Sequence, residues 1–92
     1  MPVAIVTLPP VLRERADNQT RLNVEGATVR EIIEELERRF PGIRFNLCYE
    51  TGELRPYVNI FIEKENIRYL QGLDTPVYAG AHIRVLPSVA GG

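Results

Sequence analysis

Residues 28–40 read TVREIIEELERRF, and this stretch decides the fold because it specifies one amphipathic helix with both of its ends marked. Thr28 and Glu31 form a capping box, in which the hydroxyl accepts from a first-turn N–H and the carboxylate reaches back to the cap. The apolar residues recur at helical spacing and form a single stripe: Val29, Ile32, Ile33, Leu36 and Phe40. Pro41 and Gly42 predict the end of the helix.

Segments on both sides of this helix have the patterns of strands. Residues 3–8 are apolar almost throughout, which is typical of a central strand that is buried on both faces. Residues 20–24 alternate apolar and polar side chains, so they predict a half-buried strand that pairs with the first in a hairpin. Later strands are predicted at residues 57–62 and 83–86, and a short one at residues 67–69. The remaining segments are expected to be turns and loops: residues 11–19, 43–56 and 70–80.

The order of these elements restricts the topology. One helix with one apolar stripe must cover one face of a single sheet. The last strand can lie parallel to the first, because a long stretch of chain separates them. The sequence therefore predicts an α+β fold of the ubiquitin-like β-grasp type, a mixed four- to five-stranded sheet with one main helix packed on one face.

Composition excludes several classes of function. The chain has 92 residues, enough for one domain, and its net charge of −1 gives no basic field for nucleic acid. A single cysteine, Cys48, cannot form an internal disulfide, which suits a reducing cytoplasm. No apolar run approaches the ~20 residues that cross a bilayer, and the N-terminus lacks the features of a signal peptide. We therefore expect a cytoplasmic protein that binds neither membrane nor nucleic acid.

The residue types that carry out catalysis or bind metals are not grouped in the sequence. The lone His82 has no ligand at metal spacing and is expected on the surface. Cys48 has no base nearby in sequence and is expected to be a half-buried apolar residue. Four helix carboxylates are expected to form a solvated face: Glu31, Glu34, Glu35 and Glu37. We predict no catalytic residue, no metal site and no enzymatic activity of the chain itself.

The C-terminal sequence is more specific. The chain ends in LPSVAGG, a Gly-Gly pair directly after the last predicted strand and a proline. Together with VNIFIEKENIRYLQGLDTPV at residues 58–77 and the opening VAIVTLPPVLRE, this end resembles the small sulfur-carrier proteins, which include the thiamine and molybdopterin carriers and the carrier for cysteine synthesis. The segment from Glu65 to Thr75 is most similar to the cysteine-synthesis carriers. Residues 79–82 depart from the family pattern of glycine followed by an acidic residue, at a turn position.

The resemblance implies a division of the chain and a function. A β-grasp domain at residues 1–87 would carry a flexible tail at residues 88–92. An ATP-dependent activating enzyme would adenylate the carboxylate of Gly92, and sulfur would convert it to a thiocarboxylate for a downstream acceptor enzyme such as a cysteine synthase. The carrier would bind no cofactor, because its partner uses the ATP. Pro87, Val89, Ala90 and Gly91 are the residues expected in tail recognition.

Three alternatives remain open at this point. The same tail suits the small subunit of molybdopterin synthase, although the stretch that corresponds to residues 65–75 is shorter in that subunit. It also suits a ubiquitin-like modifier that forms isopeptide bonds with lysines through Gly92. A β-grasp interaction module with an accidental Gly-Gly end is the third.

The face of the sheet opposite the helix is the expected docking surface. Parity places Val58, Ile60 and Ile62 in the core and Phe61 outward. In the first strand, Ala4, Val6 and Leu8 are assigned to the core. The predicted outward-facing docking patch is Ile5, Phe61, Arg84 and Leu86.

Overall fold

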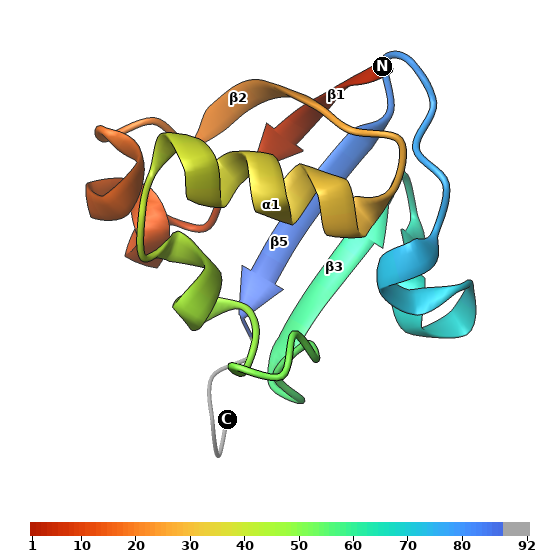
Figure 1. Ribbon diagram of the computed structural model, residues 1–92. Coiled ribbons are helices and arrows are strands. Elements are labelled where there is room, and N and C mark those ends of the chain that lie inside the picture. The colour runs from red at the N-terminus through yellow and green to blue at the C-terminus, as the bar shows by residue number, and fades with distance from the viewer. Residues whose placement is uncertain (88–92) are drawn as a thin grey trace.

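The computed structural model describes residues 1–87, and it shows one helix packed across one face of a five-stranded sheet (Figure 1). The helix α1 spans Val29–Arg39. The strands are β1 (Val3–Thr7), β2 (Arg21–Glu25), β3 (Val58–Ile62), β4 (Glu65–Asn66) and β5 (His82–Pro87). Four short 3₁₀ helices complete the described chain: η1 (Pro10–Ala16), η2 (Ile43–Asn46), η3 (Ile67–Tyr69) and η4 (Gly72–Asp74).

The sheet is mixed, in the order β2-β1-β5-β3-β4. Strand β1 pairs antiparallel with β2 and parallel with β5, and β5 pairs antiparallel with β3. The first and last strands are therefore neighbours near the centre of the sheet. This arrangement confirms the predicted β-grasp fold.

The capping box of α1 forms with one difference from the expectation. The Thr28 hydroxyl accepts from the Glu31 N–H at 3.2 Å, as predicted. The Glu31 carboxylate instead accepts from the N–H of Ala27, at 2.9 Å, one residue before the cap. Both bonds satisfy N–H groups that lack partners within the helix, so they stabilise its first turn.

The helix buries the predicted stripe against the sheet. Val29, Ile32, Ile33 and Leu36 are all buried, and Phe40 packs partly buried against the same core. The strand parity is also confirmed. The inward residues are buried: Ala4, Val6, Leu22, Val24, Val58, Ile60, Ile62, Ile83 and Val85.

The acidic face of α1 is less uniform than predicted. The Glu37 carboxylate accepts from the backbone N–H groups of Gly42 and Arg44, both at 2.9 Å, so this residue joins the helix to η2 instead of lying free in water. These two hydrogen bonds hold the pKa of Glu37 below its usual range. Hydrogen bonds from Arg38 and Arg39 lower the pKa of Glu35 to about 2.

Several segments differ from the sequence prediction, and η2 and η4 lie where only loops were expected. Residues 67–69 form η3 and not a strand; the short strand lies just before them, where β4 pairs Asn66 with Phe61. The side chain of Asn66 then accepts from the Arg68 N–H at 2.9 Å, which starts the 3₁₀ turn and lets Ile67 enter the core. The segment 11–19, predicted as a polar turn, overlaps η1, which begins at Pro10 and buries Leu12 and Ala16.

Candidate functional site

Strand β5 carries the chain to Pro87, the last residue that the structure describes. Its first half lies between two strands, with Arg84 paired to Thr7 on one side and to Phe61 on the other. Residues beyond Arg84 pair with β3 alone, ending with Pro87 opposite Val58. The predicted tail-recognition residues Val89, Ala90 and Gly91, and the sulfur-attachment residue Gly92, lie outside the described residues.

The predicted docking patch lies on one face of the sheet. Ile5 and Phe61 are partly exposed, and Arg84 and Leu86 are exposed, all on the face opposite α1. The guanidinium of Arg84 lies over the Phe61 ring, 5.7 Å from its centroid, which is a cation–π distance. The structure thus brings these four residues onto a common surface. Their role in docking stays a prediction.

His82 lies exposed on the same face, as predicted. Its backbone N–H donates to the Glu63 carboxylate at 2.9 Å, and the Tyr78 hydroxyl donates to the same oxygen at 2.7 Å. These bonds lower the pKa of Glu63, and the bond to Glu63 raises the pKa of Tyr78. Glu63 itself has a left-handed backbone with φ of 55°. Its carboxylate therefore connects a strained turn to β5 and stabilises the fold.

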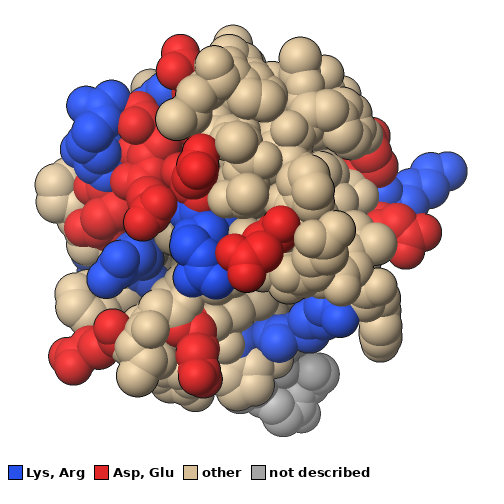
Figure 2. Space-filling view, turned by 45° about the vertical axis from the view of Figure 1, so that its right-hand side comes forward, with Lys and Arg blue, Asp and Glu red and all other residues tan. Residues whose placement is uncertain are grey.

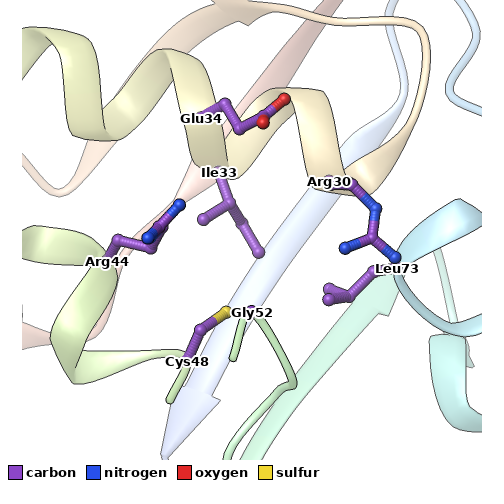
Figure 3. A pocket seen from close by; sticks show the side chains of 7 residues that line it. All are labelled: Arg30, Ile33, Glu34, Arg44, Cys48, Gly52 and Leu73. Carbon is purple, nitrogen blue, oxygen red and sulfur yellow. The ribbon is translucent and has the colours of Figure 1, made fainter. Parts of the chain in front are cut away.

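Cys48 is fully buried, not half-buried as predicted, with 2% of its surface exposed. Its sulfur faces a pocket of about 60 Å³ beneath α1 (Figure 3). The pocket is lined by Arg30, Ile33, Glu34, Arg44, Cys48, Gly52 and Leu73. Burial raises the pKa of the Cys48 thiol, so the thiol stays protonated near neutral pH and is a poor nucleophile.

A larger hollow, which no pattern in the sequence predicts, lies beside the second half of β5. We name this hollow of about 320 Å³ the β5-end groove, defined by Val11, Leu12, Phe45, Asn46, Leu47, Arg55, Tyr57 and Val85. Strand β1 has already ended at this level, so η1 and η2 form the walls in its place. The sequence offered one sign of this groove. Two apolar residues, Val11 and Phe45, lie in segments that were predicted to be a polar turn and a loop.

Charged side chains of both signs lie on the face shown in Figure 2, where acidic side chains gather at the upper left with basic side chains around them. Within residues 1–87, no group of three or more His, Cys, Asp and Glu side chains is arranged to hold a metal ion. Within the same range, no helix has the length and apolar character that crossing a membrane requires.

Comparison with known proteins identifies relatives along nearly the whole chain. The ThiS family model matches residues 6–92. The sulfur carrier protein CysO of Mycobacterium tuberculosis is 34% identical over 89 residues, which are 95% of this chain and 96% of the relative. The small archaeal modifier protein 3 of Haloferax volcanii is 34% identical over 68 residues, 74% of this chain and 73% of the relative.

Solved structures agree with the sequence relatives. A chain in the crystal structure of the Amycolatopsis orientalis BexX/CysO complex superimposes with a TM-score of 0.90 at 35% identity, and the match covers 97% of this chain and 99% of that one. Crystalline Mycobacterium tuberculosis CysO gives a TM-score of 0.88 at 31% identity, covering 94% of this chain and 99% of that one. Fold, length and sequence agree, and the chain belongs to the ThiS family.

Proposed function

We propose that this protein is a sulfur carrier and that the carboxylate of Gly92 is the group that carries the sulfur. The main support for this proposal is that the ThiS family match extends through the terminal Gly91-Gly92 pair. The Mycobacterium tuberculosis relative, which has nearly the same length as this chain, is itself named a sulfur carrier protein. In this account the chain is a protein co-substrate, and the catalytic groups belong to its partners.

The chemistry requires activation of the tail. A C-terminal carboxylate has a pKa of ~3.3–3.7, so it is anionic at neutral pH and a poor electrophile. An ATP-dependent activating enzyme would let the Gly92 carboxylate attack the α-phosphorus of ATP, which releases pyrophosphate and forms an acyl-adenylate. Sulfide then attacks the acyl carbon, the bond from that carbon to the AMP oxygen breaks, AMP leaves, and a C-terminal thiocarboxylate remains.

The geometry of the chain suits this role. Gly92 is the fifth residue after Pro87, the end of β5, and five residues at ~3.3–3.6 Å each span at most ~17–18 Å. That reach allows Gly92 to enter an active-site cleft while the domain stays outside. The last two glycines have no Cβ, so they pass between closely packed walls and accept backbone angles closed to other residues.

We propose cysteine synthesis as the pathway that receives the sulfur, in the cytoplasm, with a cysteine synthase as the acceptor. The similarity of residues 65–75 to the cysteine-synthesis carriers supports this choice. These residues form β4, η3 and η4, and both β4 and η3 contact β3.

A protein modifier is the second candidate, because one relative of 34% identity is named a small archaeal modifier protein. The same acyl-adenylate would then react with a lysine amine of a target and form an isopeptide bond. The products separate the two candidates. A carrier yields a thiocarboxylate on the free chain, and a modifier yields conjugates of higher mass.

Deletion of Gly92 tests the requirement for the tail. We expect the shortened chain to lose ATP–pyrophosphate exchange with the activating enzyme completely, because Gly91 would present its carboxylate one residue short of the reacting position. Its thermal midpoint should match that of the full chain, since Gly92 lies five residues beyond the end of β5. If the shortened chain supports exchange at the full rate, the carboxylate of Gly92 is not the reacting group.

A further inference from the structure

The β5-end groove combines a buried apolar floor with exposed apolar walls. Leu12, Leu47 and Val85 form the floor and are at most 5% exposed. Val11 on η1 is 70% exposed and Phe45 on η2 is 58% exposed. Leaving these two side chains in water forgoes stabilisation of the isolated domain, which burial in a complex would recover.

The wall that carries Phe45 is held rigidly. The N–H groups of Gly42 and Arg44 donate to Glu37, which attaches η2 to α1. On the other side, Arg55 Nε donates to the Phe45 carbonyl at 2.8 Å, and the Arg55 N–H donates to the Leu47 carbonyl at 2.9 Å. The exposed Phe45 therefore sits on an anchored backbone, so little conformational freedom remains to be lost when a partner covers it.

The lining favours an apolar ligand over a polar one. The Asn46 side chain already donates to the Gly42 carbonyl, and Arg55 Nε is engaged with Phe45. The guanidinium of Arg55 also lies 4.7 Å from the centroid of the Tyr49 ring. A groove with an apolar floor, apolar walls and internally bonded polar groups fits an aliphatic or aromatic side chain.

The groove also lies where a partner must approach. Val85 of its floor is two residues before Pro87 on the same strand, and Figure 1 shows the arrowhead of β5 beside the segment that contains η2. Any active site that holds Gly92 lies within ~17–18 Å of Pro87, the full reach of five residues. The protein surface around the opening of that active site is thus brought against the end of the domain that contains the groove.

We propose that the β5-end groove receives an apolar side chain from the rim of the active-site opening of the activating enzyme. This inference rests on the proposed function and adds a docking site distinct from the sheet face of Phe61 and Leu86. The groove lies on the helix side of β5, whereas Leu86 points to the opposite face. The tail and the groove would then hold the enzyme at two points on either side of Pro87.

Steady-state ATP–pyrophosphate exchange, with the activating enzyme and the full chain as its substrate, tests the proposal. Phe45→Ala and Val11→Ser should each raise the KM for the chain by about fivefold or more, as for a truncated anchor at an interface. The kcat should stay near the wild-type value, because the tail that reacts is unchanged. Tyr69→Ala is the matched control, since Tyr69 on η3 is 83% exposed and does not line the groove, and its KM should not change.

The outcomes separate this proposal from the function on which it rests. Thermal melts verify that each variant is folded, which the high exposure of both side chains favours. If wild-type exchange depends on Gly92 while Phe45→Ala and Val11→Ser keep the wild-type KM, the groove is not the docking site and the carrier function stands. If the wild-type chain supports no exchange, both proposals fail.

Discussion

At the scale of single residues, two neighbours on β3 have opposite environments. Ile60 is 1% exposed in the core, whereas Phe61 points to the open face and stacks with Arg84. We expect Ile60→Ala to lower the free energy of unfolding by ~2–5 kcal/mol, because it removes buried methyl groups and leaves a cavity. Phe61→Ala should lower it by clearly less. Urea denaturation of both variants measures the difference.

The same pair tests the predicted docking patch. If Phe61 contacts the activating enzyme, Phe61→Ala should weaken the complex by more than ~1 kcal/mol in titration calorimetry. Unchanged binding would remove Phe61 from the interface and leave the β5-end groove as the remaining candidate. A larger loss of stability in Phe61→Ala than in Ile60→Ala would contradict the strand parity.

Burial could be predicted from the sequence where side chains alternate or recur at helical spacing, and not elsewhere. The alternation in β3 assigned Val58, Ile60 and Ile62 correctly. Cys48 was assigned wrongly because the segment around it has no period, so its burial depends on packing against distant residues. Gly26 gives no sequence signal at all, although a Cβ there would lie 2.8 Å from the Ile32 nitrogen. Only the folded chain shows that this connection needs glycine.

At the scale of elements, the N-cap of α1 sets the start of the helix that covers the sheet. We expect Thr28→Ala to lower the free energy of unfolding by ~0.5–2 kcal/mol, since the Glu31 N–H loses its acceptor. Thr7→Ala, at an exposed position on β1, is the control and should have a smaller effect. Chemical denaturation of the two variants measures the loss in the free energy of unfolding that each substitution causes. Equal losses would mean that the cap does not stabilise this helix.

Glu37 couples α1 to η2 and makes that connection sensitive to acid. Its pKa is lower in the folded chain than in the unfolded chain, where it is ~4.3. The stability that it contributes is therefore complete above the unfolded-state pKa and is lost as the pH falls through the folded-state pKa. We expect Glu37→Gln to have a lower free energy of unfolding than wild type at neutral pH. This difference in free energy should become smaller as the pH falls.

Urea denaturation of wild type and Glu37→Gln across the range from neutral to strongly acidic pH measures this difference. Glu34→Gln is the control, because Glu34 is exposed on the same helix. A difference that is constant with pH would contradict the role given to the Glu37 carboxylate.

Elements with strong periodicity were predictable, and the short 3₁₀ helices were not. Helix α1 was predicted to within a residue at its ends, because a cap, a stripe and a terminating Pro-Gly pair agree. The segment that became η1 looked polar, since only Leu12 and Ala16 enter the core. Single turns of this kind are specified by tertiary contacts, so their local sequence carries little signal.

At the scale of the whole molecule, the topology followed from the order of the elements. One amphipathic helix required one sheet, and the long connection between the first and last strands permitted their parallel pairing. The β5-end groove could not be predicted in this way. It exists because β1 stops before β5 does, and η1 and η2 meet beside the strand that continues.

Intact mass spectrometry shows whether Gly92 carries sulfur. The full chain is incubated with the activating enzyme, ATP and sulfide, then weighed intact and fragmented, with the Gly92-deleted chain treated in parallel. We predict that the full chain gains the mass difference between one sulfur and one oxygen atom, that fragmentation locates it at Gly92, and that the deleted chain gains nothing. An unchanged mass, or sulfur found at Cys48 with Gly92 unmodified, would show that Gly92 does not carry the sulfur.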